Sequence, residues 1–243
     1  MTALDESIER RTLPLGSLAG PDDGTVDVWL IRHDRLPLAG LGALAATSEG
    51  AETRQLERVQ QRFLLRLLLG AYLDRPGRDV VIDREPAGKP VLAGEDARRL
   101  AFSQSHAGPW LAIAVSGGTP VGVDIEPGDR RPRWEKLARR YFPADDAEAV
   151  CAERAADGCR RFLDHWTARE ALVKAAGRTL AGNVAGIALG PVPDERPMAL
   201  PGDWPPGAWS LGRLQAGTDL VGHVAWAEET APALRVRQLA GPG

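Results

Sequence analysis

The segment from residue 52 to residue 73 constrains the fold most strongly, because its apolar side chains recur at the spacing of one helix face. A Pro-Gly pair at 76–77 follows and predicts the end of this helix. Arg66 interrupts the most apolar stretch, so the segment lacks the roughly 18 apolar residues that a membrane span needs. We therefore predict a long amphipathic helix of a globular protein. Its expected buried face consists of Leu56, Val59, Phe63, Leu67 and Leu68.

Short segments with the alternation and β-branched residues of strands surround this helix. The sequence predicts strands at 26–31, within 79–92, and at 110–116, 121–126, 187–190, 208–214, 220–227 and 234–239, and helices at 133–142, 145–156 and 158–176. The GGTP between 110–116 and 121–126 is short enough for a hairpin. Asp157 is the expected N-cap of the last helix, and Gly177 is its expected C-terminal stop. The pattern predicts an α+β fold with two similar subdomains, 1–118 and 119–243, each with a small sheet and a long helix.

The composition excludes some classes of function. The formal net charge is −3, so no overall basic field predicts nucleic-acid binding. The acidic amino terminus lacks the apolar core of a signal peptide, so we expect a soluble, cytoplasmic protein. Only three of the 30 basic residues are lysines. Because the chain otherwise uses arginine, Lys89, Lys136 and Lys174 are candidates for specific roles.

Two carboxylates stand two residues apart on the predicted strand at 121–126. Because side chains alternate along a strand, Asp124 and Glu126 share a face, and apolar residues take the other. Two adjacent acids repel each other unless a cation or a proton intervenes, and Mg²⁺ prefers such oxygen ligands. The alternative is a solvated edge of the sheet.

A third acid lies close to a lysine on the predicted helix at 158–176. Glu170 and Lys174 are four residues apart and share a face with Trp166. An ordinary ion pair of this spacing is the simple interpretation, worth about 0.3 kcal/mol. The other bases of this helix are arginines, and a flexible lysine charge suits a moving phosphate oxygen better than the rigid guanidinium fork does. The pair is therefore a candidate phosphate-binding group.

Three further patterns could bind phosphate or approach a ligand. Ser105 and His106 precede a small residue and a glycine, and both can hydrogen-bond phosphate; a strand entry with a satisfied histidine is the alternative. Arg62 belongs to a stripe of arginines at steps of four, and such stripes are commonly solvated helix faces. Gly88, Lys89 and Pro90 form a turn by composition, in which the lysine could also be exposed to solvent.

Taken in order, these patterns resemble the 4′-phosphopantetheinyl transferases, specifically the single-chain type that acts on carrier proteins of secondary metabolism. The resemblance covers about half the chain and lies in five motifs together with an upstream helix. The motifs are GKP at 88–90, FSQSHAG at 102–108, VGVDIE at 121–126, YF at 141–142 and WTAREALVKAAGRTL at 166–180, and the helix contains QRFLLRLL at 61–68.

The resemblance implies a pseudo-twofold duplicated fold that binds coenzyme A between its halves. Asp124, Glu126 and Glu170 would hold Mg²⁺ with the pyrophosphate, and Lys174 would contact that phosphate as charge builds on it. Glu170, directly or through a water, would accept the proton of the attacking serine, with Glu126 as the alternative base. Residues 1–118 would contact adenine and the 3′-phosphate, and residues 119–243 would contain the metal site and the phosphate-binding helix. The implied coenzyme A ligands are Arg62, Ser105 and His106 for the phosphates and Gly88, Lys89 and Pro90 for the adenine pocket.

The resemblance also implies a reaction and a partner. The phosphopantetheine arm would move to a serine of an apo acyl or peptidyl carrier protein with an acidic surface, and adenosine 3′,5′-bisphosphate would leave. We expect a monomer that binds neither nucleic acid nor membrane. Arg169 departs from the family, in which lysine is common before the metal-binding glutamate. The alternatives are a hydrolase of coenzyme A or nucleotide pyrophosphates, and an inactive carrier-binding module.

Overall fold

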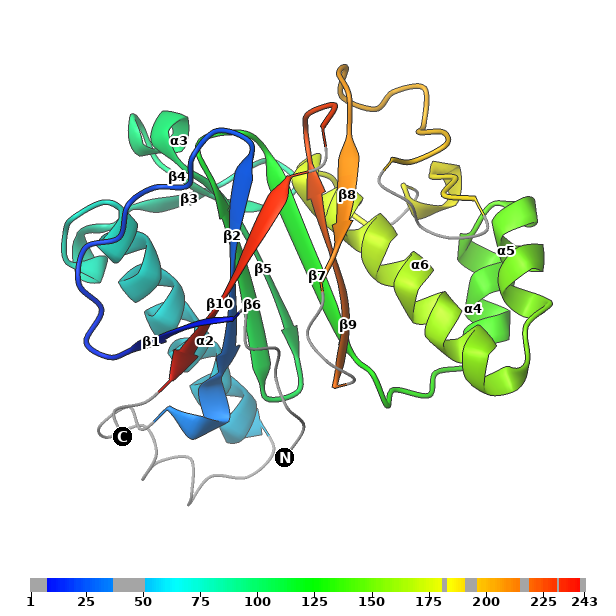
Figure 1. Cartoon of the computed structure of the whole chain (residues 1–243), viewed down its shortest axis with the longest axis horizontal. Coiled ribbons are helices and arrows are strands. Elements are labelled where there is room, and N and C mark those ends of the chain that lie inside the picture. The colour runs from blue at the N-terminus through cyan, green and yellow to red at the C-terminus, as the bar shows by residue number, and fades with distance from the viewer. Residues whose placement is uncertain are drawn as a thin grey trace.

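Two β-sheets lie side by side in the centre of the molecule, with helices at both ends (Figure 1). The computed structural model describes residues 8–36, 51–180, 183–190, 196–214, 219–230 and 232–240, apart from the side chains at 51–53, 155 and 156. The longest helices are α2 (Ala51–Tyr72) and α6 (Ala155–Ala175), which lie at opposite ends. The predicted α+β class is confirmed.

The first sheet contains five strands and packs one face against α2. In spatial order its strands are β1 (Glu9–Thr12), β10 (Ala233–Ala240), β2 (Thr25–Arg32), β6 (Trp110–Ser116) and β5 (Ala101–Ala107). Near α2 lie the hairpin of β3 (Ile82–Arg84) and β4 (Pro90–Leu92), and the one-turn helix α3 (Asp96–Arg99). Apolar residues of the helix and the sheet form one core cluster between them, which includes Leu64, Leu68, Trp29, Phe102 and Ile113.

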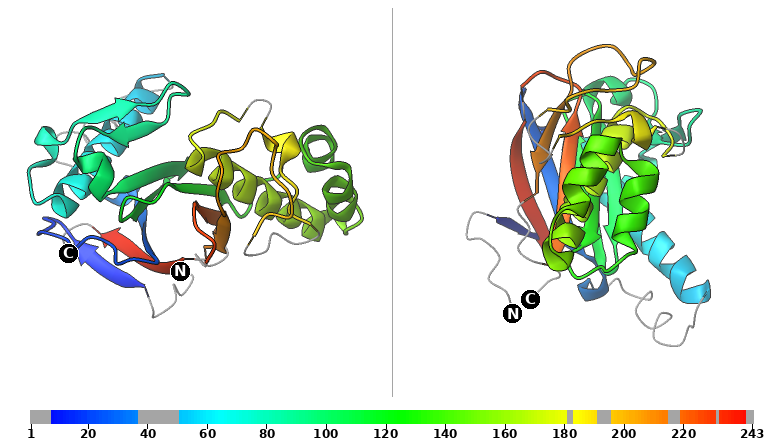
Figure 2. Two further views of the ribbon diagram at one scale, coloured as in Figure 1. Left: turned by 90° about the horizontal axis from the view of Figure 1, so that it is seen from above. Right: turned by 90° about the vertical axis from the view of Figure 1, so that its right-hand side faces the viewer.

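The second sheet is antiparallel and packs against α6. Its strands are β7 (Val121–Pro127), β9 (Leu220–Trp226) and β8 (Ser210–Arg213), and the helices α4 (Trp134–Tyr141) and α5 (Ala144–Cys151) cover the outer side of α6 (Figure 2). After α6, Gly177 has φ +65° and Arg178 N donates to Val173 O at 3.0 Å. This left-handed glycine confirms the predicted end of the helix.

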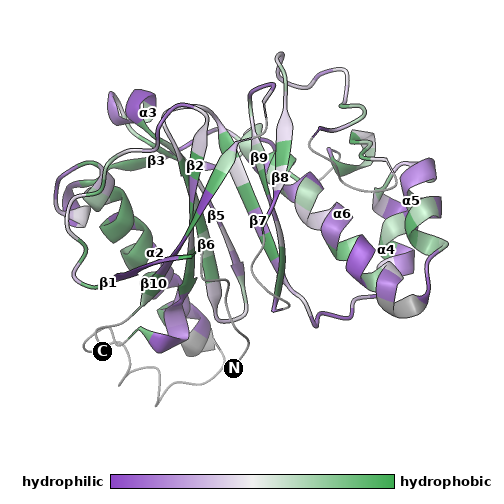
Figure 3. Ribbon diagram, in the orientation of Figure 1, coloured by the Kyte–Doolittle hydropathy of each residue, from purple (hydrophilic) through white to green (hydrophobic). Residues whose placement is uncertain are grey.

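A separate apolar core joins the two sheets. Val28 on β2 and Ala114 on β6 pack in the same cluster as Val121, Val123 and Ile125 on β7. Figure 3 shows apolar residues along the central strands, interrupted by hydrophilic ones, whereas α3 is hydrophilic. The two sheets therefore bury apolar surface against each other, which favours a fixed arrangement of β5 beside β7.

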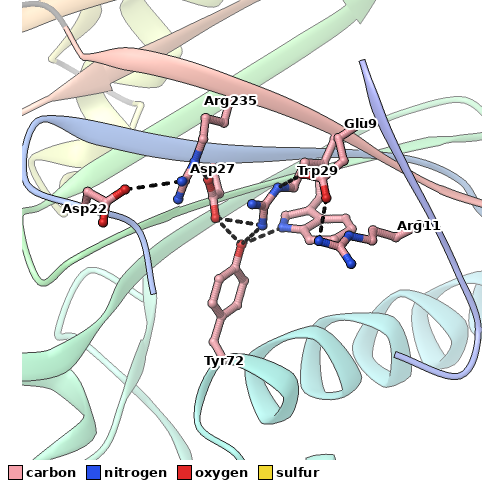
Figure 4. Close-up of polar contacts among 8 residues, drawn as sticks. Glu9, Arg11, Asp22, Asp27, Trp29, Tyr72 and Arg235 are labelled. Atoms are coloured by element: carbon pink, nitrogen blue, oxygen red, sulfur yellow. Dashed lines mark hydrogen bonds and ion pairs between the residues drawn. The ribbon is translucent and has the colours of Figure 1, made fainter. Parts of the chain in front are cut away.

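A buried polar network fixes β10 within the first sheet (Figure 4). The Asp27 carboxylate on β2 is fully buried and accepts hydrogen bonds from Tyr72 Oη at 2.5 Å, Arg235 Nε at 2.7 Å and Arg237 Nη1 at 3.0 Å. Tyr72 Oη also accepts a bond from Trp29 Nε1 at 2.8 Å. Burial and the Asp27 charge raise the pKa of Tyr72 well above its usual value. The predicted strand at 234–239 therefore exists, but it lies in the sheet of the first half, and the boundary at 118/119 stays a prediction.

The predicted hairpin between 110–116 and 121–126 is wrong. β6 pairs with β2 on one edge and with β5 on the other, so it has no free edge for β7. The GGTP instead leads the chain from the first sheet to the second, and β7 pairs with β9. The actual hairpin joins β5 to β6 through Gly108, whose φ is +55°. No strand was predicted at residues 101–107, where β5 lies.

The predicted buried face of α2 is also partly wrong. Val59 and Phe63 are 41% and 47% exposed, whereas Leu64 and Leu68 are fully buried. The segment is apolar almost all round between 63 and 69, so its periodicity fits two faces, and the packing of the sheet selects one of them.

Three smaller differences concern the ends of elements. α6 begins at Ala155, so Asp157 lies in its first turn and is not its N-cap. The predicted strand at 187–190 is reduced to an isolated bridge between Ala188 and Ala199. Residues 9–12, where no strand was predicted, form β1. Among the helices that the structure describes, none is long and apolar enough to cross a membrane.

Candidate active site

Strand β7 presents its two carboxylates toward α6. Asp124 and Glu126 lie on one face, as predicted, because Val121, Val123 and Ile125 point into the core between the sheets. Asp124 is only 3% exposed, so its face is not a solvated sheet edge. A carboxylate at this depth needs hydrogen bonds and a compensating charge.

The Asp124 carboxylate receives both. Its Oδ1 accepts a hydrogen bond from Lys174 Nζ at 2.7 Å and another from Ser105 Oγ at 2.7 Å. Lys174 also donates to the Val123 carbonyl at 3.2 Å. Asp124 Oδ2 is buried and has no hydrogen-bond partner within the described part of the chain. One oxygen of this carboxylate is therefore fixed, and the other is available to a ligand.

A glycine brings α6 close enough for Lys174 to reach β7. A Cβ atom on Gly122 would lie 2.0 Å from the Ala171 carbonyl oxygen, so no larger residue fits without moving the helix. Ala171 itself is fully buried. The small residues at this crossing therefore set the separation between the helix and the strand.

Glu170 and Glu126 complete an acidic cluster with Asp124. Burial and the Asp124 charge raise the pKa of Glu170 to about 7, while Lys174 and a hydrogen bond with Trp166 oppose this. Burial also raises the pKa of Glu126, although this side chain forms an ion pair with Arg130. We call Asp124, Glu126 and Glu170 the acidic cluster.

The acidic cluster fits a divalent cation by its chemistry. The Asp124 charge raises the pKa of both Glu126 and Glu170, so the three carboxylates are an oxygen donor set with excess negative charge, which Mg²⁺ neutralises. Within the described residues, however, no three acidic, histidine or cysteine side chains are arranged to ligate one ion. Instead, Lys174 contacts Asp124 and Arg130 contacts Glu126. The orphaned Asp124 Oδ2 is the observation that favours a further ligand here.

Lys89 reaches the second half of the molecule from the first. The turn before β4 contains Gly88 with φ +90°, and the following Lys89 Nζ donates to the carbonyls of Ala175 and Val121 at 3.2 and 3.3 Å. Burial lowers the pKa of Lys89. The lysine also borders a cavity of about 220 Å³ between the β3–β4 hairpin and β5. Lys89 is therefore not solvent-exposed, and its amine links the two halves.

The other predicted coenzyme A ligands lie in two different settings. Arg62 on α2 and His106 at the end of β5 are both exposed. Ser105 is buried and contacts Asp124, so its hydroxyl faces the acidic cluster. Gly88 precedes Lys89 in the turn, and Pro90 follows it as the first residue of β4. The structure thus brings Ser105 and Lys174 together with the acidic cluster, while the phosphate-binding roles of Arg62 and His106 stay predictions.

Two arginine contacts of this region were not found from the sequence. Arg130 follows β7 and pairs with Glu126, and no motif marks it. Arg169 is fully buried, where it contacts Asp146 and donates to the Ile187 carbonyl at 3.1 Å. It therefore anchors α6 to α5, and burial lowers its pKa to about 10.

Comparisons with known proteins agree with this geometry. The model of the 4′-phosphopantetheinyl transferase superfamily matches residues 120–225, which include the entire acidic cluster. The 4′-phosphopantetheinyl transferase HetI of Nostoc sp. is 31% identical over 212 residues, covering 82% of this chain and 86% of HetI. This chain belongs to the 4′-phosphopantetheinyl transferase superfamily.

Other transferases of this superfamily match shorter parts of the chain. The 4′-phosphopantetheinyl transferase psf-1 of Bacillus pumilus is 31% identical over 132 residues, covering 49% of this chain and 54% of that protein. A 4′-phosphopantetheinyl transferase of Bacillus subtilis is 27% identical over 125 residues, covering 48% and 54%. The family resemblance found in the sequence motifs is therefore confirmed, and the chain is a transferase.

Proposed function

We propose that this transferase moves the 4′-phosphopantetheine arm of coenzyme A to a serine hydroxyl of an apo acyl or peptidyl carrier protein. The serine oxygen attacks the phosphorus that bears pantetheine. The bond from that phosphorus to the bridging oxygen breaks, and its electron pair leaves with adenosine 3′,5′-bisphosphate. The serine proton passes to Glu170, directly or through a water, with Glu126 as the alternative acceptor.

The contact of Lys174 with Asp124, beside Glu170, carries this proposal. Phosphoryl-type transfer requires mainly the positioning of its reactants and the neutralisation of charge on the phosphate oxygens. Lys174 is a flexible cation anchored to Asp124 and to the Val123 carbonyl, which holds its amine over β7. We propose that it binds the phosphate that accumulates charge as adenosine 3′,5′-bisphosphate departs.

We propose Asp124, Glu126 and Glu170 as the ligands of Mg²⁺. A bound Mg²⁺ would supply charge neutralisation for the pyrophosphate of coenzyme A. The buried, unpartnered Asp124 Oδ2 supports this assignment, as does the mutual repulsion of the three carboxylates. Glu126 would have to exchange its ion pair with Arg130 for the cation.

We assign coenzyme A binding to both halves, which we propose are related by a pseudo-twofold duplication. Arg62, Ser105 and His106 would bind its phosphates. Arg62 and His106 are exposed and can meet an anionic ligand, whereas Ser105 would have to turn its hydroxyl hydrogen away from Asp124. Gly88, Lys89 and Pro90 would line the adenine pocket, with the aliphatic stem of the lysine as its apolar part. We further propose a cytoplasmic monomer that serves secondary metabolism.

Coenzyme A consumption with and without a carrier tests the proposal against both alternatives. The transferase should release adenosine 3′,5′-bisphosphate only when Mg²⁺ and an apo carrier are both present, in a one-to-one ratio with modified carrier. Rapid release without a carrier would indicate a hydrolase and overturn the proposal. Binding of the carrier without any release, across several carriers, would indicate an inactive binding module.

A further inference from the structure

The backbone groups on the edge of β7 that faces the first sheet have no neighbouring strand as their hydrogen-bond partner in the described sheets. β7 pairs with β9 along its other edge, and β5 pairs with β6, so the described sheets contain no backbone ladder between β5 and β7. The two strands nevertheless lie next to each other at the centre of the molecule (Figure 1). Buried backbone groups need hydrogen-bond partners, so side chains must supply them here.

Two serines of β5 take the place of the missing ladder. Val123 N donates to Ser103 Oγ at 3.1 Å, and Ile125 N is 3.4 Å from Ser105 Oγ. Both hydroxyls are buried, with Ser103 at 5% and Ser105 at 7% exposure. Because the serines are two residues apart on a strand, their side chains share one face. We call these two contacts the serine seam.

The serine seam encloses Asp124. The two amides that it binds belong to the residues immediately before and after Asp124. A hydroxyl has one hydrogen to donate and lone pairs to accept, and Ser105 uses both capacities by donating to Asp124 Oδ1 at 2.7 Å. The backbone at Asp124 is therefore held on both sides, and its carboxylate is oriented by one of the same hydroxyls.

Two lysines hold the carbonyls of the same edge. Lys89 Nζ donates to Val121 O, and Lys174 Nζ donates to Val123 O. Val123 thus has its N–H on Ser103 and its C=O on Lys174, so the strand position next to Asp124 depends on side chains from β5 and α6. A lost partner would leave a buried polar group unsatisfied, which costs about 1–3 kcal/mol.

We propose that Ser103 is a positioning residue for Asp124. Its hydroxyl fixes the Val123 amide and thereby the backbone next to Asp124. This sets the position of the Asp124 carboxylate relative to Lys174 and Glu170 and directs Asp124 Oδ2 toward a cation. Among the described residues, the hydrogen bond of Ser103 is with the Val123 amide and not with the carboxylates or Lys174, so its effect passes through β7. The link to phosphopantetheine transfer rests on the proposed function, whereas the link to the geometry of β7 does not.

Four proteins test this proposal: the unaltered chain, Ser103→Ala, Ser103→Thr and Ser210→Ala. Ser210 is a matched control, because it is fully buried on β8 and donates to the Thr230 carbonyl, away from Asp124. Backbone amide exchange at Val123 should accelerate in Ser103→Ala only. Mn²⁺ binding, measured by electron paramagnetic resonance, should weaken by about 10–100-fold in that variant, as for loss of a residue that orients a metal ligand.

The transfer reaction provides an independent reading. Ser103→Ala should lower kcat at saturating coenzyme A, with KM for coenzyme A nearly unchanged, and Ser103→Thr should restore kcat and Mn²⁺ binding by restoring the hydroxyl. If Ser103→Ala does not fold, Ser103→Cys, with a similar volume and a weak acceptor, replaces it.

Equal effects of Ser103→Ala and Ser210→Ala on Mn²⁺ binding and kcat would overturn the proposal, as would unchanged exchange at Val123 or failure of Ser103→Thr to restore function. An unaltered chain that modifies no carrier would refute the proposed function instead. The comparisons of exchange and Mn²⁺ binding then still decide the role of Ser103. If the unaltered chain binds no Mn²⁺, exchange at Val123 and kcat decide it.

Discussion

Lys174 Nζ lies 2.7 Å from Asp124 Oδ1 and joins the last turns of α6 to the middle of β7. The lysine is 30% exposed at its side chain and the aspartate only 4%, so the pair has a buried anion and a cation that reaches solvent. A ligand can therefore reach Lys174 while the anchor of the lysine stays fixed. This asymmetry underlies the first prediction.

Lys174→Ala should lower kcat by about 10²-fold or more and change KM for coenzyme A much less, because its charge acts mainly on the departing phosphate. Steady-state kinetics with varied coenzyme A measure both constants. Lys136→Ala is the matched control, since this lysine is exposed on α4 and should retain normal kinetics. A higher KM with normal kcat would reassign Lys174 to ground-state binding.

Glu170→Gln should abolish transfer yet stabilise the metal-free protein at pH 8. The raised pKa of Glu170 means that the folded state holds its proton more tightly than the unfolded state, in which the pKa is near 4.5. The free energy of unfolding therefore falls as the pH rises from about 4.5 to about 7, because the unfolded chain loses the Glu170 proton first. A neutral glutamine avoids this loss of stability. Thermal unfolding at pH 8 without metal measures the difference. Exposed Glu135 provides the control Glu135→Gln, and equal stability of both variants would contradict the prediction.

His223 should make the protein less stable in mild acid. It is buried on β9, where its Nδ1 atom lies 2.8 Å from Thr167 Oγ1. Burial lowers the pKa of His223 to about 3. The unfolded chain binds a proton near pH 6.5 and the folded chain does not, so this residue's contribution to stability falls by about 1.4 kcal/mol per pH unit below 6.5. Urea unfolding at several pH values between 7.5 and 5.5 gives the free energy of unfolding as a function of pH. This free energy should fall less steeply with decreasing pH in His223→Gln than in the unaltered chain. An unchanged pH dependence of the free energy of unfolding would mean that His223 is not held neutral.

Tyr72→Phe should destabilise the fold by about 1–3 kcal/mol without loss of transfer at saturating substrate. The change removes a donor to Asp27 and leaves the Trp29 indole N–H without its acceptor, far from the acidic cluster. Tyr141→Phe, the same substitution at the chain's second tyrosine, is the control. Free energies of unfolding from urea titration compare the two, and equal values would show that the Asp27 network contributes little.

The sequence predicted the face shared by Asp124 and Glu126 because strand alternation is a local property. It predicted the end of α6 at Gly177 for the same reason, since one glycine determines that turn. The family resemblance required only the order of the motifs along the chain. Each of these inferences depends on residues within a few positions of one another.

Contacts between segments that are far apart in the sequence could not be predicted from such local patterns. The hairpin across 117–120 failed because β2 and β5 already occupy both edges of β6, which no local pattern shows. Ser105 was interpreted as a phosphate ligand, and its contact with Asp124 depends on β5 lying beside β7. Val59 and Phe63 fit a helix face as well as Leu64 does, and only the position of the sheet distinguishes them.

The intact mass of an apo carrier protein, recorded after incubation with this chain, coenzyme A and Mg²⁺, tests the central claim most directly. We predict a gain equal to one phosphopantetheine group on the carrier serine, absent with chelator, with a carrier whose serine is replaced by alanine, and with Asp124→Ala. No gain across several carriers, or an equal gain with Asp124→Ala, would contradict the account.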